Sequence, residues 1–470
     1  MTLRRQLLLV SLLLLSLPWA GCQFIGELEA ALRKGQEQSL LATARAIGSV
    51  LGAHPELIYP TVSRRGDAPD TRTAIYAFPV ESPVIVDGYA DGWDDIPAVS
   101  LPGAAEQTGL AVTYQAITRR DQLYLLLRIQ DNNLVYHNPG ISPEPNGDRV
   151  VLRTWQNNRR QDYAIATAAP GSVKARPVSR RERGVDPGRI HGYWQDAVGG
   201  YTLELAIPLS YTGDRLGFYV VDAATGRGQP VATVGNITSL DTAAPPWLIY
   251  TPGALQETLA AFGEQDRRIQ VIDQHYWKVA DIAPVGQASS QGPKTFWLLQ
   301  WIYRSALAED PPLPTLPTAS STGKVQGEEI DRALQGHSSS LRYRDPYATN
   351  RTYLSASAPI LHEGQVIGVV AVSQSAEQYL SLTDQAFSRL LGYSLLALSV
   401  GVMALLAYAS LLSWRIGHLS RAARYAIAED GSLTQDFPRS SAADEIGELS
   451  RRYADLLQKV REHNDYLRTL

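Results

Sequence analysis

Two long apolar runs, one near each end of the chain, dominate the hydrophobic pattern of the sequence. The second run, Leu390 to Trp414, contains no charged residue. A helix over it is about 37 Å long, enough to cross a hydrocarbon core of about 30 Å. Arg415 follows at once, with two more arginines in the next ten residues. Because positive charge accumulates on the cytoplasmic side, we expect a membrane span over 386–414 that leads into the cytoplasm.

The first apolar run extends from Leu7 to Ile25, after Arg4 and Arg5 and before two glutamates. These flanks predict a first span within residues 1–26 with a cytoplasmic N-terminus. The alternative is a cleaved signal peptide, in which Ala20-Gly21-Cys22 would resemble a lipoprotein site. We favour the uncleaved span. The chain is then a multi-pass protein of a bacterial inner membrane, with a large periplasmic part between the spans.

The segment between the spans starts with helical spacing and then changes to a period of two. Apolar residues from Leu28 to Leu51 recur on one helical face. From about Thr73 onward, short apolar runs alternate with polar positions and are separated by Gly, Pro and Asp. The clearest runs are Leu123–Asp131, Gly147–Thr154, Gly200–Pro208 and Arg215–Asp222. This spacing predicts an antiparallel β-sandwich over residues 78–252.

The motifs in this region resemble the family 9 carbohydrate-binding module and its DOMON-like relatives. The resemblance rests on the turn Val86-Asp87-Gly88 followed by Trp93, on a strand that ends at Asp131, and on the strand Gly200–Pro208. It implies a sugar-binding sandwich in which aromatic rings stack on the ligand.

Three aromatic residues near predicted loops are the candidate ligand contacts: Trp155, Trp194 and Tyr136. For each of them the alternative is a place in the core or at its rim, and Trp93 is expected in the core. Asp91, Asp94, Asp95 and Asp131 could together bind calcium, although Asp in a turn is more often a turn former. We therefore expect no metal ligands and no cofactor in the chain.

The β pattern resumes after a helical stretch, Leu255 to Phe262. A hairpin is predicted around Asp273–Tyr276, a helix over Phe296–Leu307, a short helix over Glu328–Gln335, and a final hairpin, Thr352–Leu361 with Val366–Ser373. The final hairpin resembles the closing hairpin of Cache-type sensor domains. This implies a Cache-like α+β domain over 27–77 and 253–385 with the sandwich inserted; the alternative is a generic α+β domain next to the membrane.

Beyond the second span, two amphipathic helices are predicted on either side of a Gly/Pro connector. The second carries apolar residues at heptad spacing, which is typical of a coiled coil. Asp444-Glu445-Ile446-Gly447 and this pattern resemble a HAMP linker over 415–466, followed at 467–470 by the start of a dimerisation helix. The resemblance implies a parallel homodimer in which the relay residues are Asp444, Glu445, Ile446, Gly447, Leu449 and Leu456. A plain juxtamembrane coiled coil is the alternative.

Composition and motifs give no indication of nucleic-acid binding or catalysis. A net charge of −4 over 470 residues gives no indication of a nucleic-acid partner, and a single cysteine excludes an internal disulfide. The sequence has neither a phosphate-binding Gly-x-x-x-x-Gly-Lys-Ser/Thr loop nor a Gly-x-Ser-x-Gly elbow. No catalytic residue is predicted.

Taken together, the order of parts resembles the sensor histidine kinases of the proteobacterial dedicated sortase system. The expected fold is a multidomain membrane protein with two transmembrane helices, a Cache-like sensor domain, an inserted antiparallel β-sandwich and a HAMP coiled coil. Its partners would be the lipid bilayer, a second copy and an extracytoplasmic ligand, for which a glycan is the suggested class. ATP, Mg²⁺ and a response regulator enter only if a kinase core follows residue 470. The alternatives are a chemoreceptor- or cyclase-type receptor, and a membrane-anchored glycan-binding protein without signalling output.

Overall fold

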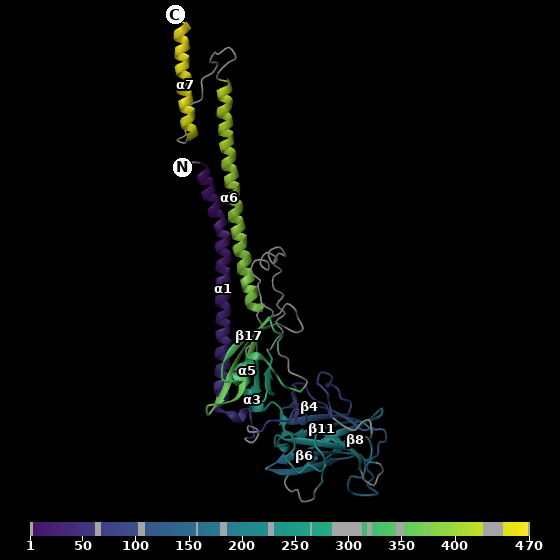
Figure 1. Cartoon of the computed structure of the whole chain (residues 1–470). Helices are drawn as coiled ribbons and strands as arrows, with labels where there is room; N and C mark the ends of the chain where they lie inside the picture. Colours follow the sequence, from purple (N-terminus) through teal and green to yellow (C-terminus); the bar gives the residue numbers. More distant parts are fainter. Residues whose placement is uncertain are drawn as a thin grey trace. The chain divides into compact units, whose positions relative to one another are not determined.

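The computed structural model shows two β regions and three long helices (Figure 1). It describes residues 3–61, 67–101, 109–156, 158–178, 186–223, 230–263, 266–283, 313–316, 322–344, 352–375, 377–425 and 445–468. The chain divides into two compact units, of which one holds residues 30–294 and 300–381 and the other holds both terminal regions with 295–299. The two units are described separately.

The first β region is a sandwich of two sheets. The larger has seven strands in the order β2-β4-β5-β11-β10-β8, with β3 also paired to β4. Its strands are β2 (Phe78–Pro79), β3 (Val99–Ser100), β4 (Ala111–Arg119), β5 (Gln122–Gln130), β8 (Gly171–Lys174), β10 (His191–Ala197) and β11 (Gly200–Pro208). All pairs are antiparallel except β2 with β4.

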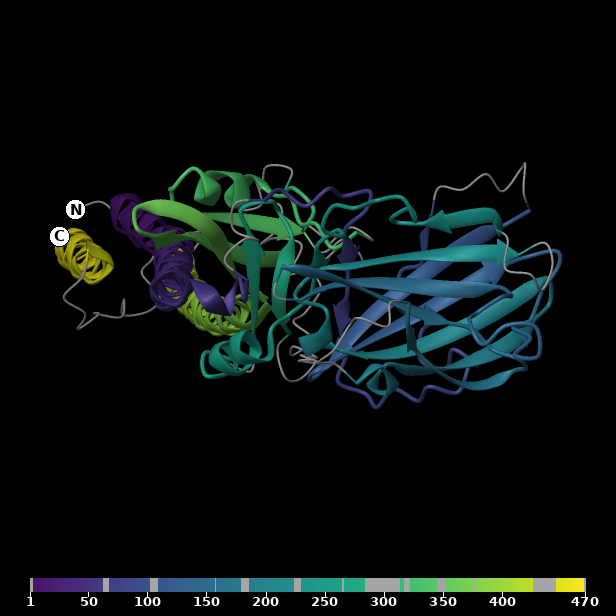
Figure 2. The same cartoon turned by 90° about the horizontal axis from the view of Figure 1, so that it is seen from below.

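The facing sheet has five strands in the order β13-β12-β6-β7-β9. They are β6 (Arg149–Gln156), β7 (Arg159–Ile165), β9 (Arg176–Pro177), β12 (Leu216–Ala223) and β13 (Pro230–Gly235). Because every pair in this sheet is antiparallel, the start of β6 and the end of β12 lie at the same end of the sheet. The predicted antiparallel sandwich is confirmed (Figure 2).

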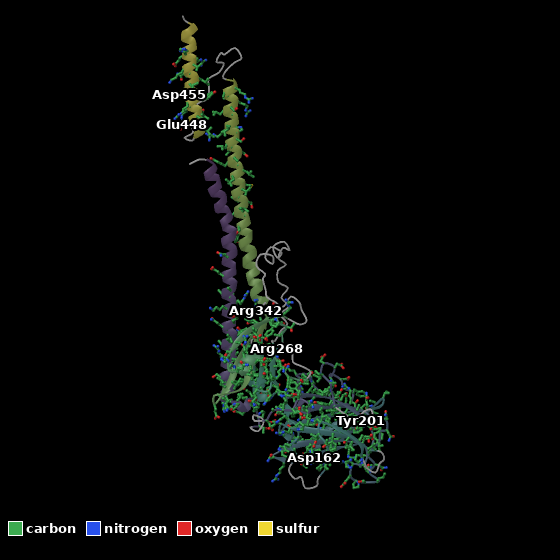
Figure 3. All side chains as sticks on the ribbon, in the orientation of Figure 1. Asp162, Tyr201, Arg268, Arg342, Glu448 and Asp455 are labelled. Atoms are coloured by element: carbon green, nitrogen blue, oxygen red, sulfur yellow. The ribbon has the colours of Figure 1, made fainter. Side chains whose placement is uncertain are left out.

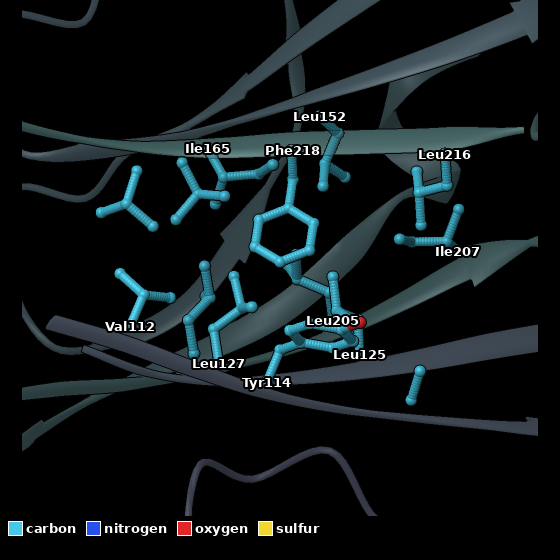
Figure 4. Close-up of a cluster of buried hydrophobic side chains, with 14 of the residues drawn as sticks. Val112, Tyr114, Leu125, Leu127, Leu152, Ile165, Leu205, Ile207, Leu216 and Phe218 are labelled. Atoms are coloured by element: carbon cyan, nitrogen blue, oxygen red, sulfur yellow. The ribbon is translucent and has the colours of Figure 1, made fainter. Parts of the chain in front are cut away.

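The core of the sandwich lies between the sheets and follows the two-residue period of the strands. Leu125 and Leu127 of β5 and Leu205 of β11 meet Leu152 and Phe218 of the facing sheet (Figure 4). The ring of Tyr114 meets that of Phe218 edge to face, with centroids 5.5 Å apart. Trp93 is 1% exposed and covers the other face of the larger sheet, where it packs with Ile117 and Leu126, as expected for a core residue.

The second β region is a five-stranded antiparallel sheet in the order β16-β15-β19-β18-β17. Its strands are β15 (Arg267–Asp273), β16 (Lys278–Ile282), β17 (Ser339–Arg344), β18 (Thr352–His362) and β19 (Gln365–Ser375). Both predicted hairpins are therefore confirmed. A two-stranded parallel pair, β1 (Ile75–Tyr76) with β14 (Leu248–Ile249), lies where the chain enters and leaves the sandwich.

Helices cover both faces of the five-stranded sheet. One face packs against the second half of α1 (Leu3–Ala53) and against α3 (Gly253–Ala260), through Leu40, Ile47 and Leu255. The other face packs against α5 (Glu328–Leu334) through Ile330 and Ala333. The helices predicted around Leu28–Leu51, Leu255–Phe262 and Glu328–Gln335 are confirmed, whereas Phe296–Leu307 lies outside the described residues.

Two further helices follow the sheet. α6 (Glu377–Tyr425) has 49 residues and α7 (Glu445–Arg468) has 24. Among the described residues, one stretch has the length and composition of a membrane span: Gly392–Arg424, with a mean hydropathy of 2.3 in its most apolar window. The predicted first span forms the beginning of α1, but its crossing of a membrane stays a prediction.

Candidate site at one end of the sandwich

The structure separates the three aromatic residues predicted to contact a ligand. Trp194, on β10, is 1% exposed and stacks on Tyr201 of β11, with ring centroids 3.9 Å apart and planes at 11°. Its ring fills the space between the sheets, so its assignment as a ligand contact is wrong. On β10, buried Gly192 and Trp194 alternate with half-buried Tyr193 and Gln195. The two-residue period of a strand was therefore the sequence signal for the burial of Trp194.

Trp155 and Tyr136 are both partly buried, but they lie at opposite ends of the sandwich. Trp155 stands near the end of β6, where its indole nitrogen donates to Asn158 Oδ1 at 3.2 Å. Tyr136 belongs to the loop that precedes β6. Seven residues of strand separate Asp148, at the start of β6, from Trp155, which corresponds to about 23 Å. These two aromatic rings cannot stack on the same small ligand.

Tyr136 has a carboxylate beside it. Its hydroxyl donates to the exposed Asp196, near the end of β10. Partial burial, together with the hydrogen bond to Asp196 and its charge, raises the pKa of Tyr136 to about 12. An aromatic face next to a fixed carboxylate offers the apolar and the hydrogen-bonding contacts by which a sugar is held.

Three buried aspartates gather at this same end of the sandwich. Asp131 follows β5, Asp148 precedes β6, and Asp222 lies near the end of β12. One carboxylate oxygen from each lies within 4.8 Å of those of the other two. Their side chains belong to residues that are 6%, 1% and 8% exposed, respectively.

Backbone amides hold two of these carboxylates. Asp148 accepts hydrogen bonds from Val135 N at 2.7 Å and from Ala223 N at 2.8 Å. Asp131 Oδ1 accepts from Asn133 N at 2.8 Å. Such bonds orient the oxygen atoms and support ionised carboxylates. The cluster is therefore positioned by the backbone of three separate elements.

The three carboxylates of this cluster carry like charges and repel one another. Burial raises the pKa of Asp148 to about 6, and the negative charges of Asp131 and Asp222 contribute to this rise. The two amide hydrogen bonds act in the opposite direction and lower this pKa. Burial, and then the charge of Asp131, also raises the pKa of Asp222. At an effective dielectric constant of about 20, two unit charges this far apart repel by about 3.5 kcal/mol.

Two buried oxygen atoms on the paired strand ends of β5 and β11 have no hydrogen-bond partner among the described residues: Asp131 Oδ2 and the hydroxyl of Tyr201. Tyr201 is 1% exposed (labelled in Figure 3). Burial and then the charges of the three aspartates raise the pKa of Tyr201 well above its usual value. Buried polar atoms without a partner are rare in folded proteins.

The calcium hypothesis drawn from the sequence grouped the wrong aspartates. Asp91, Asp94 and Asp95 are exposed and lie in the loop around Trp93. Among the described residues, Asp131 clusters with Asp148 and Asp222 instead. Each of these three stands at or beside a strand end, and this is the sequence signal that could have identified them.

Two sequence motifs meet on the outer face of the larger sheet. Glu204 of the strand Gly200–Pro208 accepts hydrogen bonds from Asp87 N and Gly88 N, both at 2.9 Å. Gly88 has φ +86°, and a Cβ there would approach Tyr193 at 2.8 Å. The two motifs therefore hold the Asp87–Gly88 turn against the sheet by hydrogen bonds, which is a structural role in the sandwich fold.

A separate hollow of about 380 Å³ lies on the α+β region. Its lining includes Pro314, Leu316, Gln326, Glu328 and Tyr343. The hydroxyl of Tyr343 donates to the buried Glu329, whose pKa is raised chiefly by burial. This hollow is another place in the described residues at which a small ligand could be held.

All of the predicted relay residues except Asp444 lie in the first half of α7. The structure describes this helix from Glu445, and Asp444 lies outside the described residues. Leu449 and Leu456 are 55% and 58% exposed, and Ile446 is half-buried. Gly447 is buried on the opposite face, with Ala454 and Leu457. The heptad positions thus form an apolar surface on the single chain.

Comparison with known proteins gives one kind of match. No family model matches the chain, and no curated protein matches it. Among solved structures, a carbohydrate binding module of family 9 from Caldicellulosiruptor kristjanssonii, in complex with cellotriose, is similar at 18% identity over 36% of this chain and 85% of its own, with a TM-score of 0.28.

Two further solved structures are similar in the same way. The same module in complex with glucose gives 18% identity, 36% and 87% coverage and a TM-score of 0.28. A protein from Bacteroides uniformis described as carbohydrate-binding gives 11% identity, 37% and 90% coverage and a TM-score of 0.25. Similarity at this level assigns neither a family nor a ligand to the chain.

Proposed function

We propose that this chain is the sensing and relay part of a membrane receptor. The observation that carries the proposal is the order of the elements, in which the central strand of the five-stranded sheet is followed closely by the apolar helix. β19 ends at Ser375, and α6 extends from Glu377 to Tyr425 and includes the stretch Gly392–Arg424. A displacement of a strand that leads into a helix can be transmitted along the helix axis.

The first helix supports the same proposal. Leu40, Ala44, Ile47 and Leu51 of α1 are all 0% exposed and form the core of the α+β region with β15, β18 and β19. A Cβ at Gly52 would lie 2.2 Å from Leu361 O of β18, so helix and strand touch there. An anchor alone would need no such insertion into the core.

We propose a glycan as the ligand class of the sandwich. Support comes from the pairing of Tyr136 with Asp196 at one end and from the sequence resemblance to carbohydrate-binding modules. Cellotriose and glucose are the first probes, because similar sandwiches have been solved with them. The receptor would reside in a bacterial inner membrane with the sandwich in the periplasm.

For the cytoplasmic side we propose a HAMP-type relay that feeds a sensor kinase. The proposal rests on the sequence from Asp444 onward and on the exposed heptad residues Leu449 and Leu456 of α7. In a parallel dimer these side chains would face their own copies. Ligand binding would then change the populations of two bundle packings.

The test of the relay uses disulfide cross-linking between copies of the full chain in membrane vesicles. Cys22, the single cysteine, is first replaced by serine, and one cysteine is placed at Leu456. Gly52→Ala then disturbs the contact between α1 and β18. Gly35→Ala, on the same helix with no atom within 4 Å of its Cβ, is the matched control. We expect Gly52→Ala, and not Gly35→Ala, to change the cross-linking rate.

The possible outcomes separate the alternatives. Equal rates in the two glycine variants would contradict the relay and favour a membrane-anchored binding protein. Equal cross-linking at Leu456 and at Arg451 would contradict a fixed parallel bundle. A reporter fused after Leu470 that proved extracytoplasmic would overturn the orientation.

A further inference from the structure

We propose that an aromatic cluster at the junction of the sandwich and the five-stranded sheet locks these two regions at one fixed angle. The cluster, called the aromatic joint below, consists of Ala74, Tyr76, Phe78, Ile249 and Trp277. Both regions belong to the same compact unit of the chain. The use of the joint as a signal route rests on the proposed function, whereas the lock itself does not.

The alternation of side chains along the two connecting strands builds one side of the joint. β1 and β14 pair in parallel where the chain enters and leaves the sandwich, and Ala77 N donates to Ile249 O at 2.8 Å just beyond β1. Ile75, Ala77 and Leu248 are buried in the core of the sandwich, whereas their neighbours Tyr76 and Ile249 belong to the joint. Because successive side chains of a strand point to opposite faces, this strand pair contributes to both clusters.

Trp277 is the contribution of the five-stranded sheet. It is 1% exposed and directly precedes β16. Its ring stacks on that of Tyr76, with centroids 6.2 Å apart and planes at 16°, and Phe78 meets Tyr76 edge to face at 4.8 Å. The ammonium of Lys324 lies 4.9 Å from the centroid of the Trp277 ring, a cation–π contact. Buried rings in close contact cannot slide past one another without opening a void, so the joint resists a change of angle.

The turn that carries Trp277 is held to the central strand of the sheet. Asp273, 1% exposed at the end of β15, accepts the amide hydrogen of Trp277 at 2.9 Å through Oδ1. Its own amide donates to Trp277 O, also at 2.9 Å. Asp273 pairs with Gly368 of β19, the strand that precedes α6. A displacement of the Trp277 ring therefore has a route of two residues to β19.

The two regions also meet around a hollow of about 110 Å³. Its lining includes the polar side chains of Glu81 and Arg120 from the sandwich and of Gln256 and Asp281 from the α+β region. Polar groups beside a hollow gain little from their contact, because water competes for their hydrogen bonds, whereas buried aromatic rings stabilise a contact. The aromatic joint, rather than this hollow, is therefore the contact that sets the angle.

Gly323 offers a way to open the joint without removing a ring. It has φ +80°, and a Cβ there would lie 2.4 Å from the ring of Tyr76. Gly336, after the end of α5, has φ +92° and no atom within 4 Å of its Cβ. Gly323→Ala and Gly336→Ala therefore impose similar backbone strain, but only the first displaces Tyr76.

The experiment measures the distance between two nitroxide labels by pulsed electron spin resonance, on the full chain in detergent micelles. Cys22 is replaced by serine, and cysteines for labelling replace two exposed residues, Val198 of the sandwich and Gln365 of the sheet. An excess of unlabelled chain suppresses distances between copies. With the native joint, we expect a single narrow distance distribution.

Gly323→Ala and Trp277→Ala should each lose this narrow distribution and give a broad one, whereas Gly336→Ala, the matched control, should keep it. A broad distribution with the native joint overturns the proposal, and so does a narrow one in both joint variants. Equal broadening in Gly336→Ala would assign the effect to backbone strain and would also overturn it. If Trp277→Ala fails to fold, Gly323→Ala decides alone.

Disulfide cross-linking through a cysteine at position 456 tests the joint as the signal route. Gly323→Ala should change the cross-linking rate, and Gly336→Ala should not. Gly52→Ala acts inside the α+β region and therefore separates two failures. An unchanged rate in Gly323→Ala alone contradicts the joint as the route, whereas an unchanged rate in Gly52→Ala as well contradicts the relay itself.

Discussion

The two β regions of this chain bury their strands in different ways. In β5 of the sandwich, buried Leu123, Leu125 and Leu127 alternate with half-buried positions, except at Leu126, which the Trp93 loop covers. In β19 of the five-stranded sheet, seven consecutive residues, Ile367–Ser373, are buried. The loop around Trp93 covers part of the outer face of the larger sandwich sheet, whereas helices cover both faces of the five-stranded sheet.

This difference separates two roles. The strand ends and loops of the sandwich carry polar chemistry, as the aspartate cluster and the Tyr136–Asp196 pair show. A sheet enclosed by helices has little free surface, but its core includes α1, and its central strand leads into α6. In the proposed function, the sandwich would serve recognition and the enclosed sheet the transmission of a displacement.

The largest expected effect tests the core of the sandwich. Trp194→Ala should lower the free energy of unfolding by about 3–5 kcal/mol, because it removes a fully buried ring that stacks on Tyr201. Trp93→Ala should cost a similar amount. Trp155→Ala is the matched control and should cost about 1 kcal/mol, since this ring is only partly buried. Denaturant unfolding of the full chain measures all three, and equal losses for Trp155 and Trp194 would contradict the assignment.

The second prediction tests the enclosed sheet. Ile47→Ala should cost about 2–4 kcal/mol, because Ile47 is 0% exposed in the core shared by α1 and the sheet. Leu32→Ala, on the same helix but 39% exposed, should cost less than about 1 kcal/mol. Thermal unfolding should show that Ile47→Ala lowers the transition of the α+β region. A lowered melting transition of the sandwich alone would contradict the place of Ile47 in the core of the α+β region.

The third prediction concerns the turn fastened to the larger sheet. Glu204→Gln should lower the free energy of unfolding by about 1–3 kcal/mol. The amide hydrogens of Asp87 and Gly88 lose the charged oxygen that they share as acceptor in the wild type. Glu81→Gln, at an exposed position, should have almost no effect. Equal stability of the two variants would show that the hydrogen bonds contribute nothing measurable.

The smallest expected effect is a pH dependence shared by both regions. Burial disfavours the charge of Asp162, but hydrogen bonds from Arg160 and Arg153 outweigh it and lower its pKa (Figure 3). Burial also raises the pKa of Asp281 in the α+β region, but the hydrogen bonds and charges of Arg268 and Lys278 outweigh burial and lower this pKa.

Because both folded-state pKa values lie below the unfolded value of about 3.9, the stabilisation is complete above that pH and is lost as pH falls through the folded-state values. Melting temperatures measured downward from about pH 5 should therefore fall in both regions. Asp162→Asn should flatten the pH dependence of the sandwich transition and leave that of the α+β transition unchanged. A sandwich transition with the same pH dependence in this variant would contradict the role of Asp162.

Much of the secondary structure could be read from local pattern. The long helix through Leu51, the hairpin around Asp273–Tyr276 and the helical character of α7 follow from hydrophobic period and turn residues. The burial of Trp93 followed from its motif. The position of Trp194 did not: its place near a predicted loop suggested exposure, whereas the register of β10 turns it inward onto Tyr201.

The sequence by itself determined the elements, because helical and strand periods depend on neighbours a few residues apart. Only the tertiary structure decided which strand ends coincide. Asp131, Asp148 and Asp222 lie far apart in the sequence and meet because antiparallel pairing brings the end of β12 to the start of β6, and the facing sheet brings the end of β5 to the same place. Contacts between sheets depend on how whole layers pack, and no local pattern encodes them.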